Sequence, residues 1–257
     1  AYGIAVTLTM VITTLLLHAV ATQRWKWPAG VAAVVTGAFL GIDLAFFGAN
    51  LLKVLHGGWL PLVIGGALFA LMTTWKTGRQ MLAQRLAARA VPLEQFVQAA
   101  LAKDPIRVPG TAVFMTAQTE GAPAALVHNL RHNRVLHDRV IILTVQTTRT
   151  PHVAPEDRLS VRPMGRELYN AVLRYGFMDE PNVPEALALA AQNGLLSDAG
   201  DVTYFLGRET VIVTKTPGMA LWRERLFVVM AKNAVRATAF FKLPPDAVVE
   251  LGVQVEI

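Results

Sequence analysis

The chain has 257 residues, of which 53% are hydrophobic, and its mean hydropathy is +0.41. It has a net charge of +6 and no cysteine, which excludes disulfides and thiolate metal sites. The apolar excess is too large for an ordinary soluble domain and is concentrated near the amino terminus, so the composition predicts a membrane region followed by one globular domain. Because several basic residues flank apolar segments, the positive charge favours membrane anchoring over nucleic-acid binding.

Residues 1–79 are predicted to form the membrane part. A membrane-spanning helix needs about 20 mostly apolar residues, and residues 2–22, 27–52 and 59–75 meet this requirement. Tryptophans mark the ends of these segments, where aromatic rings favour the headgroup layer: Trp25, Trp27, Trp59 and Trp75. The sequence begins inside an apolar run with no charged leader or cleavage site, so we expect no signal peptide here and a chain that is part of a longer one.

The basic residues predict the orientation of these helices, since Lys and Arg accumulate on the cytoplasmic side. Arg24 and Lys26 lie between the first two segments, and only Lys53 lies between the second and third. Four more follow the third segment: Lys76, Arg79, Arg85 and Arg89. We therefore expect the first link and everything after residue 76 to be cytoplasmic, and residues 53–58 to be outside.

Asp43 lies within the second segment, where a carboxylate costs at least about 2.5–3.5 kcal/mol, so it should face protein or water. Asn50 lies two helical turns further on the same face. Gly37, Gly41 and Gly48 form a row that would let another helix approach closely. Asp43 is either an ion or proton site or a structural buried acid, and its position toward the outer end favours the second interpretation.

The first segment has Tyr2, Thr9 and Thr13 on one side. Their hydroxyls could line an ion pathway, but threonine hydroxyls also bond to the preceding helical turn, which we favour. His18, near the inner end, is expected to be hydrated. Holding an ion takes several oxygens at once, so the three helices are better interpreted as a packing surface for further helices.

Residues 80–104 are predicted to be an amphipathic connector, helical over 81–98 and interrupted at Pro92. Residues 105–257 are predicted to be a cytoplasmic mixed α/β domain. The expected strands are 111–117, 139–147, 158–163, 202–206 and 248–257, and the expected helices are 124–134, 184–193 and 218–233. Segment 168–177 fits a strand or a helical turn, and 209–215 a strand or the extension of one. The first strand, helix and strand predict a parallel unit with a right-handed crossover. The last helix is expected to direct Leu221, Leu226, Phe227 and Met230 toward the core.

Chemical motifs are scarce in this domain, and we expect no enzymatic activity. His128 and His132 are four apart on a helix and His137 follows, but no glutamate completes an H-E-x-x-H zinc motif, so hydrated histidines are favoured. Two arginine sets could hold a phosphate, although charged surface is the favoured interpretation: Arg131, Arg134 and Arg139, and Arg208, Arg223 and Arg225. The glycine-rich phosphate-binding motifs and the G-x-S-x-G nucleophile motif are absent.

Several strings together resemble one family along the whole chain. They include Ile42-Asp-Leu-Ala-Phe-Phe-Gly-Ala-Asn50, His56-Gly-Gly-Trp-Leu-Pro-Leu, Arg107-Val-Pro-Gly-Thr-Ala-Val-Phe-Met115, Arg174-Tyr-Gly-Phe-Met178 and the closing run from Leu243 to Ile257. In these strings the chain is similar to the carboxy-terminal part of Kup-type potassium uptake proteins, the KUP/HAK/KT family.

The resemblance implies a role in a transporter of about twelve helices that moves K⁺ inward with protons, without a cofactor, in the bacterial inner membrane. It implies that these three helices are the last of the set. It further implies a cytoplasmic domain that regulates the transporter or joins it into a homodimer.

The family's ion sites lie mainly in early helices that this sequence does not contain, so no ion ligand is carried over. Asp43, Asn50, Tyr2 and Thr9 remain the intramembrane polar candidates. Two alternatives stay open: a membrane-anchored module that senses a ligand such as a cyclic dinucleotide, and a membrane-bound hydrolase that uses the histidines.

Overall fold

The computed structural model describes residues 2–52, 59–102, 104–119, 121–192, 201–212 and 218–256, so the outer turn expected at 53–58 lies outside the described residues. The chain divides into two units, residues 1–75 and 76–257, which are described in turn.

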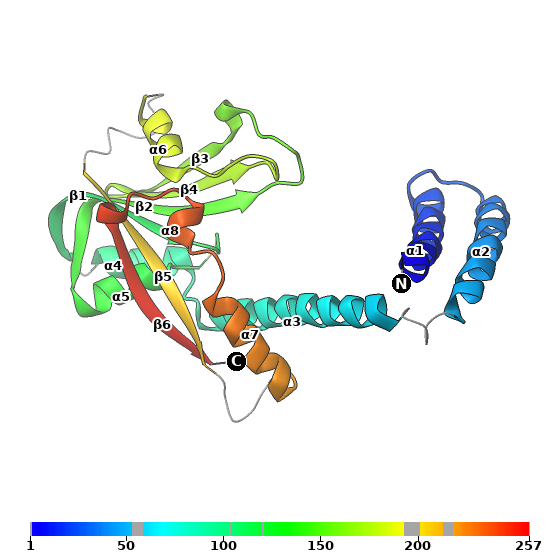
Figure 1. Cartoon of the computed structure of the whole chain (residues 1–257). Helices are drawn as coiled ribbons and strands as arrows, with labels where there is room; N and C mark the ends of the chain where they lie inside the picture. Colours follow the sequence, from blue (N-terminus) through cyan, green and yellow to red (C-terminus); the bar gives the residue numbers. More distant parts are fainter. Residues whose placement is uncertain are drawn as a thin grey trace. The chain divides into compact units, whose positions relative to one another are not determined.

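The first unit consists of α1 (Tyr2–Gln23), α2 (Ala29–Leu51) and the first half of α3 (Trp59–Arg89) (Figure 1). All three helices are long and apolar enough to cross a membrane. Pro28 precedes the first turn of α2, where its fixed φ suits a helix start and its missing N–H is not needed. α1 and α2 pack against each other as an antiparallel hairpin.

α3 does not end where the predicted membrane segment ends. It continues as one helix through residues 76–89, so the first part of the predicted connector 80–104 is an extension of this helix. Nothing in Trp75-Lys-Thr-Gly-Arg79 stops a helix, because one glycine costs only about 1 kcal/mol. The break comes just before Pro92, as predicted, and α4 (Leu93–Ala102) follows.

The second unit is built on a six-stranded sheet with the order β3-β4-β2-β1-β5-β6. Its strands are β1 (Ile106–Thr116), β2 (Val135–Thr147), β3 (Leu159–Gly165), β4 (Leu168–Tyr175), β5 (Val202–Ile212) and β6 (Val248–Glu256). All neighbours are parallel except β3 and β4. These two form a hairpin through Arg166 and Glu167, whose φ of 43° and 58° match a two-residue turn of type I′. The sheet confirms the mixed α/β class.

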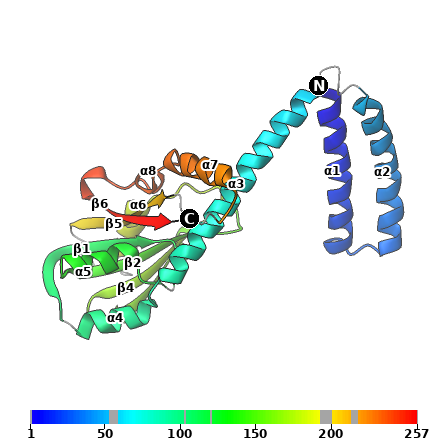
Figure 2. The ribbon, with the colours of Figure 1, turned by 90° about the horizontal axis from the view of Figure 1, so that it is seen from below.

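Helices cover both faces of the sheet (Figures 1 and 2). α4 and α5 (Ala124–His132) pack on one face, over Ala112, Phe114 and Ile142. α6 (Val183–Gln192) packs on the other, over Val113, Ile141 and Leu143. Because both faces are covered, β1 and β2 are apolar without interruption at their centres.

Two segments with open assignments are now decided. Residues 168–175 form strand β4, and residues 209–212 extend β5. The β1–α5–β2 unit is parallel, as predicted.

The last part of the chain contains α7 (Leu221–Lys232), α8 (Ala237–Phe240) and β6. α7 packs against the part of α3 that belongs to this unit. A Cβ on Gly78 would overlap the Phe227 ring, and a Cβ on Gly218 would overlap the end of Met81. Phe227 is fully buried, as predicted, but the prediction for Leu221 was wrong, since 52% of it is exposed. The reason is that α7 rests on α3 through the face that carries Phe227, which turns Leu221 outward.

Candidate functional site

The first candidate site is a polar seam between α1 and α2. Asp43 on α2 is only 6% exposed, and its Oδ2 accepts a 2.6 Å hydrogen bond from Thr14 Oγ1 on α1. At 2.6 Å this bond lies at the short end of the range for hydrogen bonds between two oxygen atoms. Asp43 therefore faces protein rather than lipid, and α1 supplies its donor.

The seam continues toward the α1–α2 link. His18 Nδ1 lies 3.0 Å from Thr36 Oγ1, which is itself 2.6 Å from the Ala32 carbonyl. The single hydroxyl proton of Thr36 goes to Ala32, so this geometry selects the tautomer in which His18 Nδ1 donates. His18 is half-buried, and its ring contacts α2 through Thr36.

At the other end of the hairpin, Asn50 approaches Gly3. A Cβ on Gly3 would lie 2.7 Å from Asn50 Oδ1, so the glycine makes room for the amide. The amide nitrogen of Asn50 donates to the Phe46 carbonyl at 3.0 Å. Asn50 and Asp43 thus share the face of α2 that contacts α1.

A hollow of about 450 Å³ lies beside this seam, lined by Ala5, Val6, Thr9, Met10, Thr13, Thr14 and Asp43. Thr9 and Thr13 line it, but their hydroxyls donate within α1, to Ala5 and Thr9 carbonyls at 2.8 Å. Tyr2 does not line it and is 84% exposed. A dehydrated cation needs several oxygens, and this wall offers chiefly one carboxylate that already accepts a hydrogen bond. The described residues of the first unit therefore provide one side of a possible ion site and too few oxygen ligands for a complete one.

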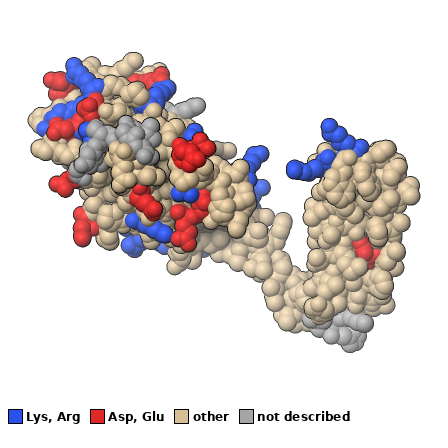
Figure 3. All heavy atoms as spheres, turned by 90° about the horizontal axis from the view of Figure 1, so that it is seen from above, with Lys and Arg blue, Asp and Glu red and all other residues tan. Residues whose placement is uncertain are grey.

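Charge on the first unit is confined to a few places (Figure 3). The face drawn there is almost entirely uncharged, with basic groups at one end of the hairpin and one acidic group on its side. Asp43 is the only Asp or Glu before Glu94. A carboxylate in such apolar surroundings is costly unless another group covers it, which makes Asp43 the leading candidate site residue of this unit.

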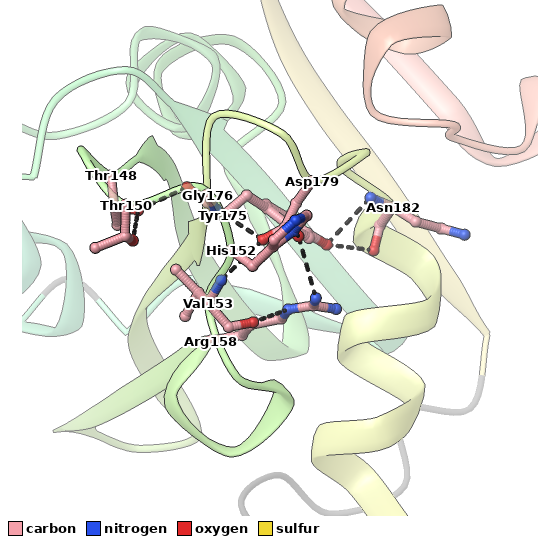
Figure 4. A network of polar contacts seen from close by, with 9 residues as sticks. All are labelled: Thr148, Thr150, His152, Val153, Arg158, Tyr175, Gly176, Asp179 and Asn182. Carbon is pink, nitrogen blue, oxygen red and sulfur yellow. Dashed lines mark hydrogen bonds and ion pairs between the residues drawn. The ribbon is translucent and has the colours of Figure 1, made fainter.

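The second candidate site is a network around Asp179, at the carboxyl ends of β2 and β4 (Figure 4). The Asp179 carboxylate accepts from His152 Nδ1 at 2.7 Å, Gly176 N at 2.8 Å and Val153 N at 3.0 Å. The Arg158 guanidinium lies 3.7 Å away. These donors, the His152 bond above all, lower the pKa of Asp179 to about 2. Asp179 thereby links the loop after β2, at His152 and Val153, to the turn after β4, at Gly176.

Tyr175 lies next to these groups and joins the network to α6. Its hydroxyl donates to the Asn182 carbonyl at 2.8 Å and accepts from Asn182 N at 3.1 Å, and burial raises its pKa. Asn182 also caps α6, since its Oδ1 accepts from Glu185 N at 3.3 Å. A hollow of about 80 Å³ lies alongside, far below the roughly 300 Å³ at which small-molecule sites begin. The network is therefore better suited to holding the loop than to binding a nucleotide.

The predicted histidine and arginine sets do not converge on one point. The His128 and His132 rings stack with centroids 5.8 Å apart, whereas His137 packs edge-on against Phe205 and burial lowers its pKa. Within the described residues, no group of three His, Cys, Asp or Glu side chains could hold a metal ion. Among the arginines, Arg139 pairs with Glu167 and Arg208 with Glu250, at 3.2 and 3.3 Å.

Sequence reasoning missed Thr14, Thr36 and Asp179. A seven-residue spacing could have revealed the first two. Small or polar residues recur at this interval in both helices, at Thr7, Thr14 and Ala21 and at Thr36, Asp43 and Asn50, and this spacing is typical of two helices in contact. Asp179 carried no signal beyond its place in a turn.

A hairpin of apolar helices with a buried carboxylate, followed by a mixed α/β domain, defines an integral membrane protein with a large water-exposed part. Two family models match in order: the K⁺ potassium transporter integral membrane domain over residues 1–80, and the K⁺ potassium transporter C-terminal domain over residues 109–257. The chain belongs to the K⁺ potassium transporter family.

Curated relatives match along the whole chain. It is 49% identical over 263 residues to "Probable potassium transport system protein Kup" of Bdellovibrio bacteriovorus, covering 39% of that protein. It is 50% identical to the protein of the same name in Myxococcus xanthus and 51% identical to "Probable potassium transport system protein Kup 2" of Chromobacterium violaceum, covering 39% and 41% of them. The chain thus spans about two fifths of the length of these relatives, and the resemblance stated from the sequence is confirmed.

Proposed function

We propose that this chain is the carboxy-terminal part of a potassium uptake transporter that couples K⁺ entry to protons. The observation that carries this proposal is the match of the entire chain, at about half identity, to proteins named as potassium transport systems. In this proposal α1, α2 and α3 are scaffold helices, and the ion pathway lies mainly in helices outside this sequence.

The surface of the hairpin supports the scaffold role. Gly37, Gly41 and Gly48 do not lie at the α1–α2 contact, because a Cβ on any of them would meet nothing within 4 Å among the described residues. The glycines of α3 at 65 and 66 are equally open. Small residues that face outward allow further helices to pack closely. A further helix could also pack into the hollow beside Asp43.

A chimera tests this proposal. This chain would replace the matching part of the Chromobacterium violaceum relative, and cells that cannot take up potassium would be plated at limiting K⁺. We expect the chimera to restore growth and this chain alone, or the relative without the matched part, to fail. Growth with this chain alone would reject the scaffold role. Loss of uptake when the proton gradient is collapsed would support proton coupling, and unchanged uptake would reject it.

We propose that the chain crosses the bacterial inner membrane several times with the α/β domain in the cytoplasm. Support comes from the basic residues at the α1–α2 link and after residue 75, and from the bacterial relatives. This chain has no cysteine, so single cysteines can be placed at Leu52 and Ser160 in a chimera from whose other part any cysteines have been replaced by serine. An impermeant maleimide should label position 52 in intact cells and position 160 only after lysis. The reverse pattern would reject this orientation.

For the α/β domain we propose regulation and homodimer formation. β3 and β6 are the edge strands of the sheet, and each pairs on one side only among the described strands, which leaves backbone groups for a second copy. Light scattering of the chain in detergent should give twice the mass of one chain. One-chain mass at every concentration tested would reject the dimer.

A ligand-sensing role is the second candidate for this domain. Its support is topological: β1 is flanked by β2 and β5, so the strand order reverses there, and open α/β sheets bind ligands at such points. A cyclic dinucleotide should raise the melting temperature of the chain in nanodiscs if it binds the native state. No shift and no heat of binding at millimolar ligand would reject this role.

A further inference from the structure

α7 has an outward face that is unusually apolar for a helix of a water-exposed domain. Leu221, Trp222 and Val229 are 52%, 58% and 56% exposed, and Val235, just beyond the helix, is 76% exposed. The inward face carries Phe227, which is fully buried against α3. A contiguous exposed apolar face of this kind marks a surface that contacts something other than water.

The same face is basic. Trp222, Arg225, Val229 and Lys232 follow at intervals of three or four residues, so they share one side of the helix. Arg225, Lys232 and Arg236 are exposed, and the one acid between residues 218 and 242, Glu224, is buried. Apolar and basic side chains mixed on one helix face are typical of helices that lie in a membrane interface.

The chain itself keeps α7 close to the predicted membrane boundary. α7 packs on α3 at Gly78, three residues after Trp75, which is about 5 Å along a helix axis. Two exposed residues of this part of α3, Lys76 and Arg85, are also basic, and the sequence has no acid between Asp43 and Glu94. Clusters of Lys and Arg next to a membrane helix are attracted to anionic lipid headgroups.

We propose that α7 is an interfacial helix that binds the anionic lipid surface of the bilayer that α3 crosses. Trp222 and Val229 enter the boundary between headgroups and acyl chains, while Arg225, Lys232 and Arg236 contact lipid phosphates. Lipid explains this face better than a second copy does, because a two-fold contact would bring the same basic residues together with no exposed acid on α7 to offset them. The inference depends on α3 crossing a membrane and is independent of what the protein transports.

Site-specific labels in the full chain test this proposal. Single cysteines at Trp222 and Val229, with Leu189 on α6 as control, would carry an environment-sensitive fluorophore in nanodiscs. Leu189 is an exposed apolar residue at 39%, on a different helix of the same unit. We expect blue-shifted emission and quenching by brominated lipids at 222 and 229 but not at 189. Both signals should rise by about twofold or more when anionic lipid replaces part of the zwitterionic lipid.

Charge variants separate the electrostatic attraction of α7 to anionic lipid from the insertion of its apolar side chains. Arg225→Glu, Lys232→Glu and Arg236→Glu together should abolish the response to anionic lipid, and the three glutamine substitutions should weaken it. Circular dichroism and melting identify any variant that fails to fold, in which case the glutamine variant and salt titration of the unchanged chain decide. Labels at 222 and 229 as accessible to aqueous iodide as the label at 189 would overturn the proposal. The proposal would also be overturned, in favour of contact with a second copy, if the labels at 222 and 229 stayed protected from iodide in detergent without lipid and this protection rose with protein concentration.

Discussion

The Thr14 hydroxyl donates a 2.6 Å hydrogen bond to the Asp43 carboxylate, which joins α1 to α2 across 29 positions of sequence. Both side chains are buried between the two helices. A membrane carboxylate that would be costly in lipid thereby becomes part of the helix contact. The bond gives Asp43 a structural role in this chain, whatever groups from further helices also approach it.

Replacing Thr14 with valine should weaken the hairpin. Interhelical hydrogen bonds in membranes contribute about 0.6–1.7 kcal/mol, and the substitution keeps the shape while removing the donor. Reversible unfolding of the chain in mixed detergent micelles would measure the loss. Thr13→Val is the matched control, because Thr13 donates only within α1 and its loss should be smaller. Equal effects of the two substitutions would contradict the proposed role of the seam.

Gly78→Ala should loosen α7 from α3. The added methyl would overlap the fully buried Phe227 ring, and overpacking of this kind costs about 1–3 kcal/mol. Melting temperature and protease sensitivity of the α7 region would report the change. Gly66→Ala in the same helix has open space around it and should be neutral or stabilise the helix by up to about 1 kcal/mol. Adding Phe227→Leu to Gly78→Ala should recover part of the loss, and no recovery would argue against a direct clash.

Asp179→Asn should destabilise the α/β domain in a pH-dependent way. The folded-state pKa is about 2, below the ordinary 3.8, so the fold favours the charged form. That contribution is complete above the ordinary pKa and is lost as the pH falls through about 2. The difference in melting temperature between the unchanged chain and the variant should therefore be largest near neutral pH and shrink between about pH 4 and pH 2. Asp246→Asn, at an exposed position, is the control, and a pH-independent difference would contradict the role of Asp179.

Tyr175→Phe should cost more than Tyr169→Phe. The Tyr175 hydroxyl makes two hydrogen bonds with the Asn182 backbone in a buried setting, whereas the Tyr169 hydroxyl makes an exposed 3.3 Å contact with Glu167. At about 0.5–1.5 kcal/mol per bond, we expect a loss of roughly 1–3 kcal/mol for the first substitution and little for the second. Denaturant unfolding measures both. Similar values would mean that Tyr175 acts mainly through the packing of its ring.

The predictable parts of this protein were those that depend on short stretches of sequence. Apolar runs long enough to span a bilayer, and an uninterrupted apolar strand such as 139–147, differ from their surroundings within a few residues. The strand order was not predictable, because all the parallel strands are similarly apolar and nothing local says which neighbour each will take. The assignment of 168–177 stayed open because a strand and a helical turn bury its leucines equally well.

The candidate site likewise has one residue that the sequence could predict and partners that it could not. Asp43 could be singled out because a carboxylate in a membrane segment is costly wherever it points. Its partner could not, because every threonine of α1 is able to bond to its own helix, and Thr9 and Thr13 do so. Asp179 could not be singled out, since two of its three hydrogen-bond donors, His152 and Val153, lie more than twenty residues earlier in the chain.

The sequence by itself determined the membrane segments, the α/β class and the family, because hydropathy, periodicity and motif strings are local properties that survive without coordinates. Only the tertiary structure decided that Thr14 covers Asp43, that α3 continues past the predicted membrane boundary to receive α7, and that Leu221 and Trp222 face outward. The physical reason is that the direction of a side chain depends on which surface its helix rests against. That choice is made by packing between distant segments.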